Sequence, residues 1–276
     1  MIPRRLIQTG KSRSLSPLAR AAVTNLKLLH PDWEYTFFDD EDVRRFIHAE
    51  YPGYRAVFDG FRHLIQRFDF FRYLAVHRHG GFYFDLDVFL YKDLSELLDK
   101  QCVFPFEEIT INPMLRGRYG LDWEIGNYGF GVAPAHPFLE AIIENCVRAQ
   151  RDPNWLNPML AGIPRILRSE YYVLNTTGPG LLSRTLAENP DIAQLVTVLF
   201  PDDVCDTANW HKFGTFGLHL MNGSWRPKAG YLYRRLAGWW ELRLRRRLLR
   251  QSARLGPRRD NLKAAAQAER VIEVRA

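Results

Sequence analysis

The stretch GGFYFDLDVFL, residues 80–90, decides the fold of this chain. Its apolar residues surround two carboxylates, Asp85 and Asp87, and together they predict one short strand. Because strand side chains alternate between faces, Tyr83, Asp85 and Asp87 would share one face, and the opposite face would be apolar. Like charges this close repel, and burying them without a partner costs several kcal/mol. The strand is therefore predicted to have a core face and a polar working face.

A divalent cation would resolve the repulsion between the two carboxylates. Carboxylate oxygens suit Mg²⁺ or Mn²⁺, and an Asp-x-Asp pair at the carboxyl end of a parallel strand can hold an ion that also ligates a diphosphate. Ligands of open α/β sheets bind at that edge of the sheet. The alternative is a solvent-facing strand end with two ordinary surface carboxylates, since Asp-x-Asp is common by chance.

The segment before this strand predicts a helix over residues 61–79 that ends at Gly80. Asp69 and Arg72 are three residues apart, so a helix places them side by side on one face. One interpretation is a buried ion pair that only fixes the helix. The other is a pair that binds sugar hydroxyls, which need fixed donors and acceptors together.

The rest of the chain alternates strand and helix patterns over 276 residues with 46% hydrophobic content. This alternation predicts an α/β protein with a largely parallel sheet and enough apolar residues for one sizeable core. Asp39 or Asp40 is expected to cap a helix that runs through Ile47. The other expected strands are 4–8, 34–38, 127–133, 195–200 and 217–225, and the other expected helices are 17–29, 94–98, 136–150, 155–168 and 177–188.

The three cysteines are widely spaced and form no Cys-x-x-Cys pair. They predict reduced thiols and a cytoplasmic location. The first residues lack the apolar core of a signal peptide, so none is expected. No apolar run approaches the roughly 20 residues of a membrane-spanning helix.

The net charge of +7 is concentrated near the C-terminus. Residues 234–276 contain 12 Arg and one Lys against three Glu and one Asp, so the remainder is slightly acidic. This distribution argues against a nucleic-acid-binding core, and it predicts a body over 1–233 followed by a basic helical tail over 234–276. Leucines and tryptophans within 232–255 can form an apolar stripe. The tail would either pack on the body or lie on an anionic membrane surface, at the inner membrane face.

The stretch RFDFFRYLAVHRHGGFYFDLDVFLYKDL, residues 67–94, resembles the DXD sugar-nucleotide region of family 32 glycosyltransferases. That group includes yeast Golgi α-1,6-mannosyltransferases, animal α-1,4-galactosyltransferases and bacterial capsule and lipopolysaccharide enzymes. Weaker similar pieces extend over most of residues 2–226. The resemblance implies a GT-A fold, with a Rossmann-like nucleotide-binding sheet and flanking helices. It also implies metal-dependent, retaining transfer of a hexose from a nucleotide-diphosphate sugar, to a saccharide or lipid-linked acceptor in surface polysaccharide or glycolipid synthesis.

The same resemblance implies roles for individual residues, with Mn²⁺ or Mg²⁺ as the cofactor and a UDP- or GDP-hexose as the donor. The residues implied at the sugar and in catalysis are Asp69, Arg72, Asp85 and Asn127. Those implied at the nucleotide and diphosphate are Gln8, Thr9, Tyr83, Asp85, Ser224 and Trp225. Those implied at the metal are Asp85, Asp87 and His219, with Ser224 as an alternative to the histidine.

One departure from the family pattern concerns the nucleobase. Members usually begin with a strand ending His-Gln-Thr-Trp, whereas this chain has Ile7-Gln8-Thr9-Gly10. Gln8 and Thr9 can still contact a base, but the stacking aromatic is missing at position 10.

Two other functions remain as alternatives. YFDLDVFL also resembles the nucleophile motif of HAD-type phosphatases, but that class needs a lysine after the motif, and residues 101–209 contain none. A non-enzymatic protein that binds membrane surfaces through its tail is the second alternative.

Overall fold

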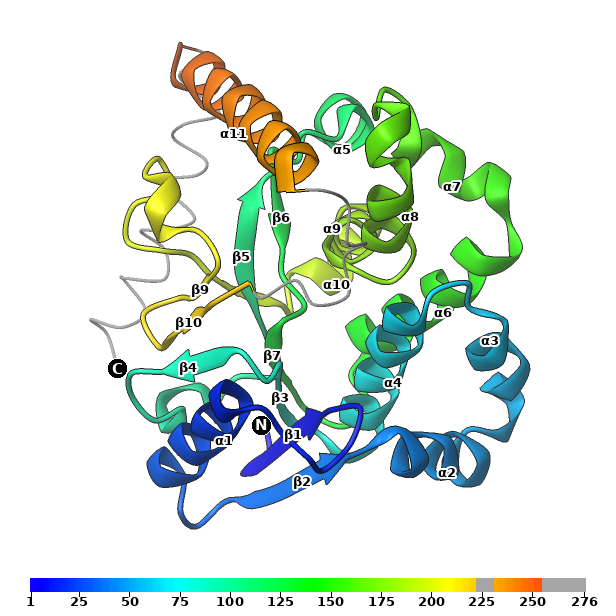
Figure 1. Cartoon of the computed structure of the whole chain (residues 1–276), viewed down its shortest axis with the longest axis vertical. Coiled ribbons are helices and arrows are strands. Elements are labelled where there is room, and N and C mark those ends of the chain that lie inside the picture. Colours follow the sequence, from blue (N-terminus) through cyan, green and yellow to red (C-terminus); the bar gives the residue numbers. More distant parts are fainter. Residues whose placement is uncertain (222–230, 255–276) are drawn as a thin grey trace.

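A computed structural model describes residues 1–221 and 231–254. The strands are β1 (Arg5–Thr9), β2 (Glu34–Phe38), β3 (Gly81–Phe84), β4 (Val88–Leu90), β5 (Cys102–Ile109), β6 (Trp123–Ile125), β7 (Gly129–Val132), β8 (Thr197–Leu199), β9 (Lys212–Phe213) and β10 (Gly217–His219). The helices are α1 (Pro17–Leu29), α2 (Asp40–Glu50), α3 (Arg55–Gly60), α4 (Leu64–His79), α5 (Pro113–Arg118), α6 (Pro137–Arg151), α7 (Pro153–Leu160), α8 (Arg168–Thr176), α9 (Pro179–Glu188), α10 (Pro190–Ala193) and α11 (Tyr231–Arg254). Figure 1 shows the sheet running through the middle of the molecule, with helices around it.

The large sheet has the strand order β2-β1-β3-β7-β5-β6, and β8 pairs with β5. β1 is parallel to both β2 and β3, and β8 is parallel to β5, whereas β7 and β6 pair antiparallel with their neighbours. The predicted α/β class is confirmed, although the sheet is mixed where a largely parallel one was expected. Its parallel part, β2-β1-β3, is joined through helices in the Rossmann-like manner expected of the GT-A fold.

Local sequence explains where the flanking helices begin. The Ser16 side chain caps α1, and Asp39 forms a capping box with Asp42 at the start of α2. Of the two expected caps for α2, Asp39 is therefore the one used. The helix expected over 155–168 is shorter than predicted, because α7 ends at Leu160. An irregular segment and a 3-10 turn at Arg165–Leu167 then lead into α8.

Two glycines allow the chain to turn from α4 directly into β3. Gly80 has a φ of +65° and Gly81 a φ of +106°, which favour glycine. A Cβ at Gly80 would lie 2.7 Å from the Pro134 side chain, and one at Gly81 would lie 2.6 Å from the Arg5 carbonyl oxygen. A side chain at either position would displace β3, which leads into the two carboxylates.

The prediction of one strand over residues 80–90 is wrong. β3 ends at Phe84, β4 begins at Val88, and Asp85-Leu86-Asp87 connects them. The reason is that the two halves pair with different sheets. β3 pairs with β1 and β7, whereas β4 joins the small antiparallel sheet β4-β10-β9. The alternation of faces assumed for a single strand therefore stops at Phe84.

Apolar cores lie on both sides of the large sheet. One core joins α4, α6 and α9 to the sheet through residues such as Phe71, Phe130 and Leu181. The other joins α1 and the small sheet to it through residues such as Leu26 and Phe213. Polar side chains gather at the carboxyl ends of β1 and β3, where Thr9 ends β1 and Asp85 directly follows β3.

The basic C-terminal helix α11 packs on the body through one face. Leu244, Leu248 and Leu249 lie against apolar clusters of the body, and Arg245 is 5% exposed. The Arg245 guanidinium bonds to the Glu108 carboxylate and to the Ile109 carbonyl oxygen, both on β5. Figure 1 shows α11 lying across the end of β5. Among the described residues, no helix combines the length and apolar character needed to cross a bilayer.

Candidate active site

The connection between the two sheets carries the acidic pair. The Asp85 N–H donates to the Tyr128 carbonyl oxygen at 2.7 Å, and the Leu220 N–H donates to the Asp87 carbonyl oxygen at 3.0 Å. The Gln8 amide donates to the carbonyl oxygens of Phe84 and Asp85, at 3.4 Å each. These bonds hold the backbone of the pair from both sheets.

Asp85, Asp87 and His219 form a cluster that fits a divalent cation. Each offers a ligand atom within 4.8 Å of the others. His219 lies opposite Val88 across the small sheet, and its Nε2 is 3.3 Å from Asp87 Oδ1. The imidazole stacks on the Tyr128 ring, with centroids 4.3 Å apart. Two carboxylates and one imidazole are a donor set that Mn²⁺ accepts in proteins.

A buried guanidinium lies behind the acidic pair. Arg72 Nη1 is 3.1 Å from Asp85 Oδ1, and Arg72 Nη2 is 3.1 Å from Asp69 Oδ1. Nη1 also donates to the Asn127 carbonyl oxygen at 2.8 Å. The guanidinium lies over the Tyr83 ring at 4.6 Å. Because the Arg72 side chain is only 4% exposed, its charge acts on the two carboxylates with little screening by water.

The Asp69 carboxylate accepts hydrogen bonds from residues distant in sequence. Asn127 Nδ2 donates to Asp69 Oδ1 at 3.1 Å, and Thr177 Oγ1 donates to Oδ2 at 2.8 Å. Asn127 Nδ2 also donates to the Tyr73 hydroxyl at 2.9 Å. The network thus joins α4, the segment before β7 and the C-terminal end of α8.

Burial dominates the protonation of this network. It raises the pKa of Asp69 to about 6, against the lowering effect of the Arg72 charge. Burial likewise raises the pKa of Asp85, and Arg72 again opposes the change. For Arg72 burial alone would lower the pKa, but the Asp85 and Asp69 charges outweigh it and raise the pKa above its usual range. Arg72 is therefore charged, and it favours the ionised form of both carboxylates.

The structure brings most of the predicted site residues together. Asp69, Arg72, Asn127 and Tyr83 surround Asp85, and Asp87 and His219 lie on its other side. Thr9 Oγ1 is 3.2 Å from the Tyr83 hydroxyl, which donates to Asp85 at 2.7 Å. Gln8 is 1% exposed, and its side chain is engaged by the acidic connection and by Tyr35. The predicted Ser224 and Trp225 lie outside the described residues.

Three further groups at the site had no signal of their own in the sequence. Thr177 bonds to Asp69, which lies 108 positions away in the sequence. Glu107 on β5 lies 3.3 Å from His211 Nδ1. The His211 carbonyl oxygen in turn accepts the His219 N–H at 3.0 Å. This pair ties the metal-ligand candidate His219 to the large sheet.

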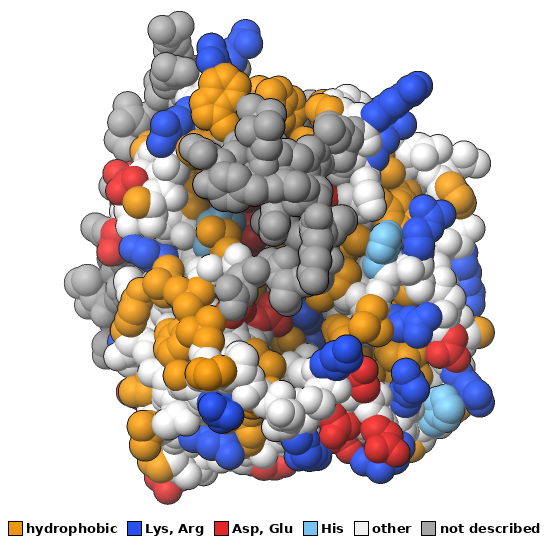
Figure 2. All heavy atoms as spheres, viewed as in Figure 1, with side chains coloured by type: hydrophobic (Ala, Val, Ile, Leu, Met, Phe, Trp, Pro, Cys, Tyr) orange, Lys and Arg blue, Asp and Glu red, His pale blue; other side chains and the backbone are white. Residues whose placement is uncertain are grey.

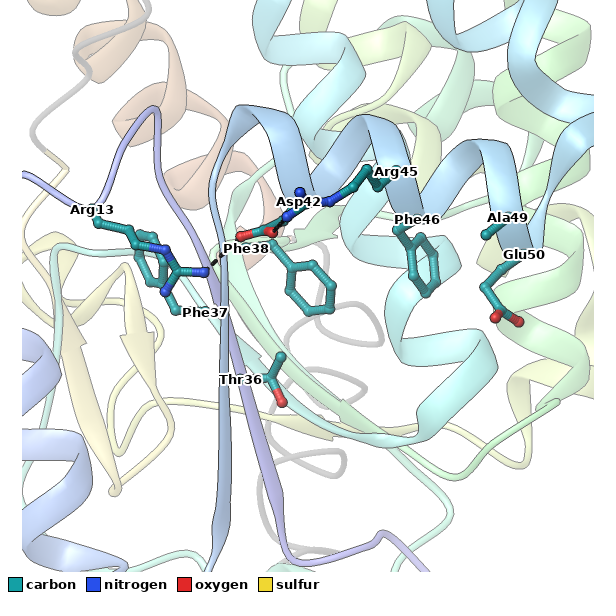
Figure 3. A pocket seen from close by; sticks show the side chains of 9 residues that line it. All are labelled: Arg13, Thr36, Phe37, Phe38, Asp42, Arg45, Phe46, Ala49 and Glu50. Atoms are coloured by element: carbon teal, nitrogen blue, oxygen red, sulfur yellow. Dashed lines mark hydrogen bonds and ion pairs between the residues drawn. The ribbon is translucent and has the colours of Figure 1, made fainter.

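Figure 2 shows acidic side chains recessed near the centre of the visible face, with a basic side chain beside them. A different hollow, of about 430 Å³, lies beside β2 and is shown in Figure 3. Arg13, Phe37, Phe38 and Phe46 are among the residues that line it, and Asp85, Asp87 and His219 are not.

Glu124 on β6 provides a test of the electrostatics beside the site. Its burial, together with the nearby Glu108 carboxylate, raises the pKa of Glu124 to about 7. Between pH 4.5 and 7 the folded state therefore holds a proton that the unfolded chain releases, so the free energy of unfolding falls as the pH rises. Glu124→Gln, which cannot ionise, should be more stable than the wild type at pH 8 by about 1–3 kcal/mol.

The difference between Glu124→Gln and the wild type should disappear at pH 4, where Glu124 is protonated in both states. Urea denaturation at pH 4, 6 and 8 measures this. Glu96→Gln is the matched control because that carboxylate is 61% exposed. A difference that stays constant across this pH range would contradict the assignment.

Comparison with known proteins yields one family. Residues 17–104 match the model of the "glycosyltransferase sugar-binding region containing DXD motif". The chain is 32% identical over 147 residues to inositol phosphoceramide mannosyltransferase 3 of Schizosaccharomyces pombe, covering 53% of this chain and 38% of that protein. It is 27% identical over 183 residues to mannosyl phosphorylinositol ceramide synthase SUR1 of Saccharomyces cerevisiae, covering 66% and 41%. The chain thus spans about two-fifths of the length of these curated relatives.

Two solved structures are also similar to the chain. The PaToxG glycosyltransferase matches with a TM-score of 0.46 and 14% identity, over 70% of this chain and 76% of that one. The ligand-free glycosyltransferase domain of the YGT toxin matches with a TM-score of 0.47 and 10% identity, over 71% and 80%.

Proposed function

We propose that this chain moves a hexose from a nucleotide-diphosphate sugar to a hydroxyl acceptor. The premise is that residues 17–104 belong to the glycosyltransferase family with a DXD-containing sugar-binding region. The observation that carries the proposal is the cluster of Asp85, Asp87 and His219 directly beside buried Arg72. It combines a cation site with a fixed positive charge at the carboxyl edge of the sheet, where a diphosphate would need both.

The acidic pair would hold the diphosphate end of the donor. A divalent cation on Asp85, Asp87 and His219 would neutralise the negative charge that grows on the leaving diphosphate. Mn²⁺ and Mg²⁺ both remain candidates. The segment that contains Ser224 and Trp225 would supply further hydrogen bonds to the diphosphate.

The network behind the acidic pair would hold the sugar and the nucleoside. Asp69, Arg72, Asp85 and Asn127 are assigned to the sugar, because they form one rigid set of donors and acceptors. Tyr83 and Thr9 are assigned to the nucleoside side, since their hydroxyls lie next to each other at the ends of neighbouring strands. Gln8 is assigned to the same side as a positioning residue, because its amide holds the acidic connection.

The transfer would retain the configuration of the sugar. The bond between the anomeric carbon and the diphosphate oxygen breaks, and the acceptor oxygen bonds to the same face. The proton of the acceptor hydroxyl goes to the leaving diphosphate, so this route needs no protein nucleophile. The acceptor is proposed to be a saccharide or a lipid-linked saccharide, as in the synthesis of surface polysaccharides or glycolipids.

A panel of donors tests the proposal. UDP-galactose, UDP-glucose, UDP-N-acetylhexosamine and GDP-mannose are incubated with the full chain and Mn²⁺ or Mg²⁺, and released UDP or GDP is measured. The names of the yeast relatives make GDP-mannose the first donor to try. Release that stops on chelation supports the function. No release with any donor, together with hydrolysis of a generic phosphoester, would favour the phosphatase alternative.

The exposed face of α11 supports a location at an anionic membrane surface. At 100° per residue, Trp239, Trp240, Arg243, Arg246 and Arg247 share one arc of the helix, and all five are exposed. Arg245 and the leucines of the opposite face hold the helix on the body. Tryptophan and arginine are suited to the lipid headgroup region. A cytoplasmic protein would then lie peripherally on the inner membrane face.

Vesicle flotation tests the membrane contact. Replacing Arg243, Arg246 and Arg247 by Gln should weaken binding to vesicles that contain phosphatidylglycerol roughly 100-fold, because each cation contributes about 1 kcal/mol at such a surface. Tyr91→Ala is the control, since Tyr91 is 60% exposed but directly follows β4 of the small sheet and is not part of α11. Equal binding by the triple variant and the wild type would remove the membrane contact and leave the transferase proposal intact.

A further inference from the structure

The base of a nucleotide donor needs an aromatic face or hydrogen-bonding groups near the acidic pair. Gln8 is buried, and its amide bonds to the carbonyl oxygens of Phe84 and Asp85 and accepts from the Tyr35 hydroxyl. Thr9 is 8% exposed, and its hydroxyl is engaged with Tyr83. Both side chains at the end of β1 already bond within the protein, and neither is aromatic, so a face on which the base can stack must come from another residue.

Phe37 supplies an aromatic ring at this edge. It is paired in register with Gln8 across β1 and β2, so the two side chains lie on the same face of the sheet. Unlike Gln8, Phe37 is only half-buried. Figure 3 shows Phe37 on one side of β2, with Phe38 and Phe46 on the other.

Gly10 brings the Phe37 ring next to the acidic connection. A Cβ at Gly10 would lie 2.8 Å from Phe37 Cζ and 3.1 Å from Leu86 Cδ1, and Leu86 is the residue between Asp85 and Asp87. The φ of Gly10 is not in the left-handed region, so the glycine is required by space and not by backbone conformation. The ring of Phe37 thus fills the place that a side chain at position 10 would take.

The loop that follows Gly10 places a cation over this half-buried ring. Arg13 in that loop pairs with Asp39 at 3.3 Å and with Asp42 at 2.8 Å, which ties the loop to the start of α2. Its guanidinium lies 6.0 Å from the centre of the Phe37 ring and is largely exposed. Phe37 is thus a half-buried ring with a largely exposed cation over it, and bases stack on aromatic rings of this kind, to which arginine adds cation–π attraction.

We infer that Phe37 is the platform on which the base of the donor nucleotide stacks, with the diphosphate held at the acidic pair beyond Leu86. The inference rests on the proposed function, because it requires a nucleotide at this edge. It assigns the stacking role to β2, in place of the aromatic that is absent from position 10. Stacking is tolerant of the base, so Phe37 would favour a nucleoside diphosphate over pyrophosphate without selecting uracil or guanine.

Calorimetric binding of UDP, GDP and pyrophosphate in the presence of Mn²⁺ tests this inference. Phe37→Ala should weaken the binding of the nucleoside diphosphate that the wild type binds by roughly 10- to 100-fold, and should change pyrophosphate binding less than about twofold. Phe37→Trp should restore nucleotide binding. Thr36→Ala is the matched control, since it lies next along β2 with its side chain on the opposite face, and it should bind both ligands as the wild type does.

The outcomes separate the inference from the function on which it rests. Unchanged nucleotide binding by Phe37→Ala, or an equal loss of nucleotide and pyrophosphate, would overturn the role of Phe37 while the proposed function stands. A wild type that binds pyrophosphate but neither nucleotide would overturn it as well. A wild type that binds neither UDP, GDP nor pyrophosphate would contradict both the proposed function and the inference.

Discussion

Asp87→Asn is expected to reduce sugar-nucleotide turnover about 10³-fold or more. The substitution keeps the shape of the side chain but removes one of two carboxylates at the proposed cation site. Stabilisation of a leaving diphosphate by a metal contributes several kcal/mol to the transition state, and each 1.36 kcal/mol is a factor of ten in rate. Release of UDP or GDP from the best donor, at saturating Mn²⁺, measures the loss.

A direct readout of the cation separates its loss from general damage. Mn²⁺ binding, followed by the electron paramagnetic resonance of the free ion, should weaken with Asp87→Asn, and the thermal unfolding midpoint should stay close to that of the wild type. Asp99→Asn is the matched control, because that carboxylate is 73% exposed and is not part of the Asp85, Asp87 and His219 cluster. Near-normal turnover by Asp87→Asn with Mn²⁺ present would remove the site assignment.

Arg72→Met is expected to destabilise the fold by about 3–5 kcal/mol at pH 8. Methionine fills much of the same space, but it leaves the Asp69 and Asp85 carboxylates without their buried counter-charge. Loss of a partner from a buried ion pair is costly because the remaining charge stays desolvated. Urea denaturation gives the free energy of unfolding directly.

The pH dependence of the Arg72→Met defect identifies its cause. The pKa of Asp69 is already raised to about 6, and Arg72 is the main group that lowers it. Without Arg72 the pKa of Asp69 rises further, so the folded variant takes up a proton that the unfolded chain does not hold. The defect should therefore shrink as the pH falls from 8 to 5. A defect that is the same at both pH values would point to lost packing instead. Arg72→Lys, which retains the charge without the planar fork, should lie between the variant and the wild type.

The sequence predicted those parts of the site that depend on local spacing. Asp69 and Arg72 lie three residues apart on α4, and this spacing alone places them side by side. Asp85 and Asp87 follow β3, whose apolar pattern marks it as a buried strand. Both features arise from regular geometry within one or two elements, which is why they could be recognised in advance.

The remaining parts depend on pairings between distant segments. The division of residues 80–90 follows from the pairing of β4 with β10, which lies about 130 residues further along the chain. Thr177 reaches Asp69 only because the C-terminal end of α8 packs beside α4. Glu107 and His211 meet for a similar reason, since β9 packs near β5. None of these contacts leaves a periodic pattern in the sequence.

The two carboxylates lie in the short connection between the two sheets: Asp85 directly follows β3, and Asp87 directly precedes β4. The third candidate ligand, His219, lies on β10, the antiparallel partner of β4 in the small sheet. A cation bound by all three side chains would therefore link the small sheet to the large one. Binding of the donor with its cation would then also stiffen the contact between the small sheet and the large sheet. Release of the ion with the nucleoside diphosphate product would loosen that contact.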